Sequence, residues 1–126
     1  MAIIDRHIFI KEIQMIQSDK FLHAENIAWE NPEPGVTRQI LGYDDQLMLV
    51  KVVFEKGAVG SAHRHPHSQT TLVESGKFEV TIDGETAVLS AGDGYYVAPN
   101  LLHGCVCLEA GMLVDTFSPH RADFLK

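Results

Sequence analysis

The chain has 126 residues, a length that fits one domain with its own hydrophobic core. Its formal net charge of −7 disfavours binding along a phosphate backbone, so we expect no nucleic-acid partner. No apolar run approaches the ~20 residues that cross a bilayer, and the opening residues lack the features of a signal peptide. We therefore expect no membrane partner and a cytoplasmic location.

Residues 1–28 show no decisive periodicity. Their apolar side chains fit one face of a helix or an added strand equally well. Pro32 and Pro34 then interrupt regular structure. The sequence thus predicts an N-terminal extension over residues 1–28 and a single domain over residues 29–126. We expect the extension to pack across the mouth of that domain or to pair with a second subunit.

Short β-like segments follow one another through the rest of the chain. They are rich in β-branched, aromatic or alternating apolar residues and cover residues 36–41, 47–54, 70–75, 77–82, 86–89, 94–98, 104–108 and 112–117. Turn residues separate them at Asp44-Asp45, Lys56-Gly57, Ser75-Gly76, Asp83-Gly84, 91–93 and Ala110-Gly111. Asp83-Gly84 predicts a type I′ hairpin, because that turn needs positive φ at both central residues. Eight strands at ~10-residue spacing indicate an all-β domain, a small barrel or jelly roll.

Histidines concentrate in one stretch between these segments. His63, His65 and His67 alternate along the chain between Gly57 and Gly76, and His103 follows later. Side chains at i and i+2 of an extended chain project to the same side. We therefore expect His63 and His65 to share a face and to bind one metal ion together.

The role of His67 is less direct. By the same alternation it would share the face of His63 and His65, but Pro66 offers no backbone donor and is typical of an edge or bulge that re-aims the chain. We expect His67 to lie beside the metal site or on the surface. The alternative is that it replaces one of the other histidines as a ligand.

Cys105 and Cys107 are the only two cysteines. They lie two residues apart on a predicted strand, where they point the same way but fit an ordinary disulfide poorly. We expect two reduced, buried thiols.

The spacing of these residues resembles two motifs of the cupin superfamily. The segment Gly57-x5-His63-x-His65-x3-Gln69-x6-Gly76 resembles the first motif, with glutamine where many cupins have glutamate. The segment from Gly92 through Pro99 to His103 resembles the second, with Cys107 near the usual asparagine. The resemblance implies a single-domain cupin over residues 29–126, with four metal ligands: His63, His65, Gln69 and His103.

Within this superfamily the chain resembles the pectin-degradation cupins of the KdgF type, which open the ring of unsaturated uronic acids. The resemblance runs from about Trp29 to Leu125 and is most specific in residues 35–42, 63–69, 92–99 and 115–125. Residues 1–28 lie outside it.

The implied ligands carry no charge. Three neutral imidazoles and one amide oxygen leave a divalent ion its full charge of +2, which favours an anionic substrate and Lewis-acid chemistry over redox chemistry. Four protein ligands on an octahedral ion also leave two adjacent positions for chelation by a carboxylate and a neighbouring oxygen. This donor set does not select among Zn, Ni, Fe, Mn and Co.

Asp115, Phe117 and Arg121 form a second group of candidates. The KdgF-type resemblance implies that they lie at the pocket and act in turnover. Without it, Asp115 could cap a turn, Phe117 could fill the core and Arg121 could lie in solvent. Since the whole chain is acidic, binding an anionic sugar needs a local positive group, and the Arg121 guanidinium could hold a carboxylate. Arg38 and Arg64 are weaker candidates for that task, and we expect both to be exposed.

The resemblance implies a metal-dependent enzyme that converts 4,5-unsaturated monouronates to linear 5-keto-4-deoxyuronate by ring opening and tautomerisation. The alternatives are another cupin enzyme, such as a polyketide cyclase or dioxygenase, a non-catalytic sugar-acid-binding cupin, or a purely structural barrel. The expected partner is a small anionic sugar acid. A homodimer is also expected, with five apolar residues of the extension available to contact the partner: Ile3, Ile4, Ile8, Phe9 and Ile10.

Overall fold

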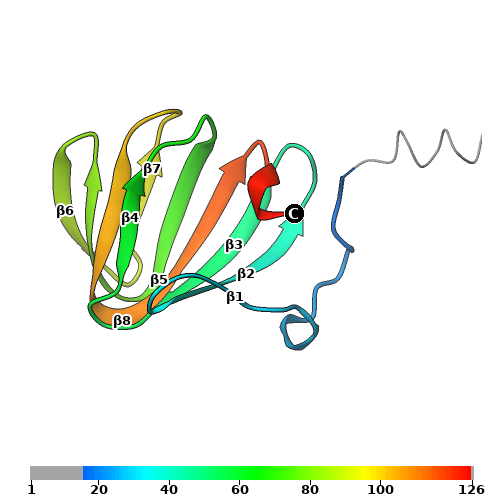
Figure 1. Cartoon of the computed structure of the whole chain (residues 1–126), viewed down its shortest axis with the longest axis horizontal. Coiled ribbons are helices and arrows are strands. Elements are labelled where there is room, and N and C mark those ends of the chain that lie inside the picture. The colour runs from blue at the N-terminus through cyan, green and yellow to red at the C-terminus, as the bar shows by residue number, and fades with distance from the viewer. Residues whose placement is uncertain (1–15, 126) are drawn as a thin grey trace, which may run out of the picture.

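The computed structural model describes residues 16–125. This part contains eight strands and two short 3-10 helices (Figure 1). The strands are β1 (Glu30–Glu33), β2 (Val36–Tyr43), β3 (Met48–Phe54), β4 (Val59–His63), β5 (Ser68–Ile82), β6 (Glu85–Ser90), β7 (Gly94–Val97) and β8 (His103–Ser118). The helices are η1 (Ala24–Asn26) and η2 (Ala122–Phe124). The predicted all-β domain is confirmed, and no helix in the described part is long and apolar enough to cross a membrane.

Two long strands, β5 and β8, organise the barrel. They pair antiparallel along their lengths and lie side by side in Figure 1. The first half of β5 pairs with β7, and the second half with β6. The first half of β8 pairs with β4, and the second half with β3, which continues to β2 and β1. Each of the two long strands therefore pairs with one short strand along its first half and with a different one along its second half.

The turns predicted at Ser75-Gly76 and Ala110-Gly111 are wrong. Both sites lie inside β5 and β8, which continue through them with shifts in register. Gly76 has a φ of +82°, and a Cβ built on it would lie 2.5 Å from the carbonyl oxygen of Glu109. A Cβ on Gly111 would overlap the Ser75 carbonyl. The glycines thus allow two paired strands to bend together without separating, which is the role of a bulge rather than a turn.

Two strands were not predicted, whereas the main hairpin prediction is confirmed. β1 contains Pro32 and lies at the edge of the sheet, where a missing backbone donor is tolerated. β4 is short and rich in small residues, so it shows no apolar alternation. Between β5 and β6, Asp83 and Gly84 have φ values of +49° and +83°, as the type I′ turn requires.

The core consists of two apolar clusters on the inner faces of the strands. One contains Val36, Phe54, Val73, Phe78, Val80, Cys107 and Leu113, and the other contains Met48, Val50 and Phe117. Members of both clusters also line a cavity on the inner side of the barrel. The strands that carry the polar side chains of this cavity therefore also carry residues of the apolar core.

The described part of the N-terminal extension packs along β2. Gln39 is fully buried, and its Nε2 donates to the carbonyl oxygens of Ala24 at 2.7 Å and Ile27 at 3.0 Å. The Ser18 backbone N–H donates to the Tyr43 carbonyl oxygen at 2.9 Å. The five apolar residues predicted for dimer contacts, Ile3, Ile4, Ile8, Phe9 and Ile10, lie outside the described residues. The dimer stays a prediction.

Candidate metal centre and pocket

Three histidines converge beside the cavity, and two of them, His63 and His103, line it. His63 ends β4, His103 begins β8, and the two are cross-strand partners with ring centroids 4.4 Å apart. His65 comes from the loop after β4. One possible ligand atom from each of the three lies within 4.8 Å of the others. His65 and His103 are buried, whereas His63 is exposed at the open side of the group.

Backbone carbonyls fix the tautomers of two of these rings. Nδ1 of His63 donates to the Ser61 carbonyl oxygen at 2.8 Å, and Nδ1 of His103 donates to that of Leu101 at 2.9 Å. A carbonyl oxygen only accepts, so Nδ1 carries the proton and Nε2 keeps its lone pair. Nε2 of His103 is buried without a hydrogen-bond partner in the described part of the protein. Both rings are thus prepared to bind a metal through Nε2.

Gln69 lies next to this cluster. Its Oε1 is 3.0 Å from Nε2 of His65, and its side chain is buried. Two ligands at right angles on one ion, each with a bond of about 2.1 Å, have donor atoms about 3 Å apart. The His65–Gln69 distance therefore fits two ligands of one cation.

Burial keeps His65 and His103 neutral at physiological pH, because it lowers the pKa of each ring. Desolvation, with a smaller contribution from the charge of Arg121, lowers the pKa of His65 to about 4. Desolvation also lowers the pKa of His103. Because a metal binds only the neutral imidazole, protons compete weakly at these rings. The three-histidine cluster fits a divalent metal ion.

His67 lies beside the cluster and bonds elsewhere. Its ring centroid is 5.3 Å from that of His65, but its Nε2 donates to the backbone carbonyl oxygen of His120 at 3.1 Å. His67 is therefore not among the three histidines that converge. It connects the loop of the metal site to the C-terminal segment that carries Arg121.

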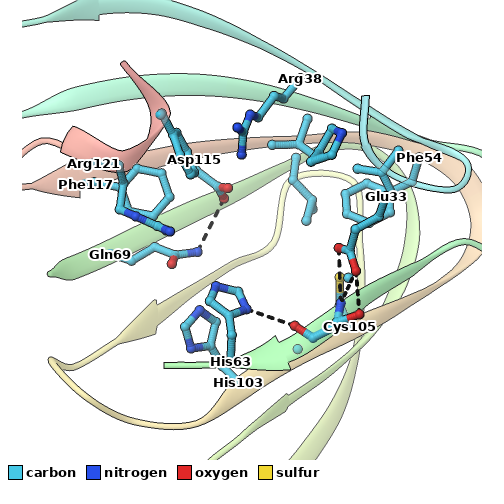
Figure 2. A pocket seen from close by; sticks show the side chains of 18 of the residues that line it. Glu33, Arg38, Phe54, His63, Gln69, His103, Cys105, Asp115, Phe117 and Arg121 are labelled. Carbon is cyan, nitrogen blue, oxygen red and sulfur yellow. Dashed lines mark hydrogen bonds between the residues drawn. The ribbon is translucent and has the colours of Figure 1, made fainter. Parts of the chain in front are cut away.

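The cavity beside the histidines has a volume of about 290 Å³. Figure 2 shows Gln69, Asp115, Phe117 and Arg121 on one side of it, with His63 and His103 below. Apolar side chains, among them Val36, Val52, Phe54 and Leu113, line the rest. The structure thus brings together the candidates from both motifs and from the C-terminal tail.

Phe117 and Arg121 pack against each other. Phe117 is only 2% exposed, and its ring centroid lies 5.2 Å from Cζ of Arg121. Arg121 also lies 4.3 Å from the ring centroid of Phe124 and pairs with Asp123 at 2.9 and 3.1 Å. The guanidinium is held by two rings and a carboxylate, which lowers the entropy lost when it binds an anion.

Asp115 lies on the wall of the cavity, opposite Thr71 in the β5–β8 register. The Thr71 hydroxyl donates to Oδ1 of Asp115 at 2.6 Å. Burial raises the pKa of Asp115 to about 6, although the Thr71 hydrogen bond and the charge of Arg121 act in the opposite direction. A carboxyl group with this pKa can both accept and release a proton near neutral pH.

The expectation that Arg38 is exposed is wrong. Arg38 lines the cavity, its Cζ lies 3.8 Å from the ring centroid of Phe124, and its Nε donates to Glu30 at 2.8 Å, so it is not an exposed surface residue. The alternation of side chains along β2 indicates this inward position, because Arg38 lies two residues from buried Val36. Arg64 is exposed, as expected.

Three further residues were not singled out from the sequence: Glu33 and Tyr95, which line the cavity, and Thr71, which bonds to Asp115. Glu33 accepts from the backbone N–H of Ser61 at 3.2 Å and from its hydroxyl. Burial and the nearby Asp115 carboxylate raise the pKa of Tyr95 well above its ordinary value, so its phenol stays protonated. Apart from strand parity, no local pattern pointed to these three positions.

Both cysteines are free, as expected, but only Cys107 is buried, whereas Cys105 is half-buried. Cys105 lines the cavity, and burial raises the pKa of its thiol to about 12. Cys107 is buried in the larger apolar cluster. Neither thiol is therefore ionised at neutral pH.

Comparison with known proteins agrees with this geometry. A cupin-domain family model matches residues 50–117. Over 108 residues, the chain is 50% identical to the pectin degradation protein KdgF of Dickeya dadantii (strain 3937), covering 84% of this chain and 98% of that protein. The chain belongs to the KdgF-type cupins.

Solved structures of cupins extend this likeness to three dimensions. An RmlC-like cupin from Shewanella frigidimarina NCIMB 400 matches with 47% identity and a TM-score of 0.84, over 87% of this chain and 99% of that one. KdgF from Halomonas sp. matches with 38% identity and a TM-score of 0.79, over 85% and 99% of the two chains. The match spans nearly the whole of each relative.

Proposed function

We propose that this KdgF-type cupin is a metal-dependent enzyme of pectin or alginate breakdown. It converts 4,5-unsaturated monouronates to linear 5-keto-4-deoxyuronate by ring opening and tautomerisation. The observation that carries the proposal is the meeting of an uncharged metal-binding cluster, the carboxyl of Asp115 and the guanidinium of Arg121 around one cavity of about 290 Å³. The 50% identity to a pectin degradation protein supports it.

The cluster His63, His65, Gln69 and His103 would hold the cation. When bound, a divalent ion there would supply Lewis-acid stabilisation of negative charge on the substrate's oxygen atoms. The donors are neutral, so the protein does not reduce the ion's charge. Zn, Ni, Fe, Mn and Co all suit this set of nitrogen and oxygen donors.

Asp115 is the proposed proton carrier. Its carboxylate takes the proton of the C1 hydroxyl as the bond from C1 to the ring oxygen breaks, which leaves an aldehyde at C1 and an enolate at C4, C5 and the former ring oxygen. The same proton is then delivered to C4, and C5 becomes a ketone. The overall change is an isomerisation without oxidant or reductant, and a pKa of about 6 suits a group that both accepts and donates.

Arg121 and Phe117 are proposed to position the sugar. The Arg121 guanidinium offers paired donors to the substrate carboxylate, and charge-assisted hydrogen bonds of this kind contribute about 1.5–3 kcal/mol each. Phe117 presents an apolar surface beside it. Together they would orient the double bond toward Asp115.

The deciding test follows the ultraviolet absorbance of the conjugated double bond in purified unsaturated galacturonate. We expect the protein to remove this absorbance with added divalent metal and to stop after chelation. Saturable binding of the sugar acid without loss of absorbance would favour a sugar-acid-binding cupin instead. Oxygen consumption with bound Fe(II) would favour a dioxygenase.

A further inference from the structure

Thr71 links the proposed proton carrier to the proposed metal ligand. Its Oγ1 lies 2.6 Å from Oδ1 of Asp115 and 3.0 Å from Nε2 of Gln69, both shorter than the direct contact of 3.5 Å between Nε2 of Gln69 and Oδ1 of Asp115 (Figure 2). Thr71 is only 3% exposed and Gln69 only 4% exposed, so water offers little competition for these bonds. The three residues lie on β5 and β8, where Thr71 faces Asp115 in register. These hydrogen bonds therefore join side chains on two directly paired strands.

The direction of each hydrogen bond follows from the number of protons. A threonine hydroxyl has one proton, and a carboxylate only accepts. Thr71 gives its proton to Asp115 and can then only accept from residue 69. Gln69 meets this requirement by donating from Nε2, which turns its Oε1 toward Nε2 of His65 at 3.0 Å. If the amide were flipped, two oxygens would face each other with no proton between them.

We propose that Thr71 is a positioning residue that aims the Gln69 oxygen at the cation, and that its bond to Asp115 is the reason for an amide rather than a carboxylate at position 69. A glutamate there would have no proton to offer Thr71, and two carboxylates would compete for one hydroxyl proton. This inference rests on the proposed metal site and not on the identity of the substrate.

The first experiment measures Zn²⁺ affinity of the full chain by competition with a chromogenic chelator. Thr71→Val keeps the shape and removes the hydroxyl, Thr71→Ser restores it, and Thr70→Val is the matched control because the Thr70 side chain on the same strand is exposed. Loss of a residue that orients a ligand typically weakens metal binding about 10–100-fold. We expect that loss for Thr71→Val, a dissociation constant close to the parent's for Thr71→Ser, and no change for Thr70→Val.

The second experiment keeps Thr71 and tests why position 69 is a glutamine rather than a glutamate. Gln69→Glu should lower the melting temperature of the chelator-treated protein. Asp115→Asn provides an amide that can donate to Thr71, whose own proton then becomes available to a glutamate at 69. The double variant Gln69→Glu/Asp115→Asn should therefore recover much of the loss. Additive effects of the two changes would contradict the proposal.

The outcomes separate this inference from the proposed function. Parent-like Zn²⁺ affinity in a folded Thr71→Val protein would overturn it, and if that variant does not fold, the double-variant experiment decides. A parent protein that binds Zn²⁺ but leaves the unsaturated uronate unchanged would refute the proposed function and leave this inference standing. A parent that binds no Zn²⁺ would refute the inference.

Discussion

Nε2 of His67 donates to the backbone carbonyl oxygen of His120, 3.1 Å away. This bond joins the loop between His63 and Gln69 to the segment that carries Arg121. In the same segment, Nδ1 of His120 donates to the carbonyl oxygen of Asp45 at 3.2 Å. These two hydrogen bonds attach the C-terminal segment to the loop after β4 and to the loop between β2 and β3, and His67 supplies one of them.

The contact predicts the behaviour of a His67→Ala variant. Its metal content should equal that of the parent, because His67 does not converge with the other three histidines. KM for the unsaturated uronate should rise more than kcat falls, since the segment that carries Arg121 loses one attachment. Metal analysis after gel filtration and steady-state kinetics measure both. A His67→Ala protein without metal would show that His67 is a ligand after all.

Asp115→Asn tests the proton carrier. The amide matches the carboxylate in size but does not exchange the proton, so we expect kcat to fall about 10²–10⁴-fold. Circular dichroism and metal content should stay close to those of the parent, because with glutamine at position 69 the asparagine amide oxygen can still accept the Thr71 hydrogen bond. Full activity in a folded Asp115→Asn protein would remove Asp115 from the proposed mechanism.

Arg121→Lys keeps the charge but loses the planar pair of donors. We expect KM to rise by roughly 10-fold or more, corresponding to one charge-assisted hydrogen bond. Arg64→Lys is the matched control, because Arg64 is exposed and should give parent kinetics. Equal kinetics for the two variants would argue against carboxylate binding by Arg121.

The raised pKa of Asp115 predicts a pH dependence of stability in chelator-treated protein. The folded protein binds this proton with a pKa of about 6, above the ~3.9 of an unfolded chain. The folded state therefore binds more protons between these values, and the free energy of unfolding falls as pH rises from about 4 to 6. A shift of this size corresponds to at most about 3 kcal/mol. Denaturant titrations of parent and Asp115→Asn should differ in this slope, and parallel curves would contradict the assignment.

Metal binding should appear as thermal stabilisation. A ligand at 100 times its dissociation constant adds about 2.7 kcal/mol to the free energy of unfolding. We expect added Zn²⁺ or Ni²⁺ to raise the melting temperature of the parent. His103→Ala removes a buried member of the cluster and should abolish most of that rise, whereas alanine at exposed His23 should leave it intact. An equal rise in all three proteins would place the metal elsewhere.

Local sequence determined those features that depend on neighbours along the chain. Period-two alternation marked most strands, and Asp83-Gly84 marked its turn because few residues adopt two successive positive φ angles. The i, i+2 spacing of His63 and His65 predicted for the same reason that the two side chains lie close together, whereas Gln69 was assigned through its resemblance to the cupin motif. Such features can be inferred without knowledge of the fold.

Only the tertiary structure decided how distant segments face one another. Gly76 and Gly111 looked like turn residues, but they allow β5 and β8 to bend together, which depends on a pairing between positions far apart in the chain. The hydrogen bond of Thr71 to Asp115 also depends on that pairing. Cross-strand register is a long-range property, because it is fixed by packing across the whole sheet rather than by the residues on either side.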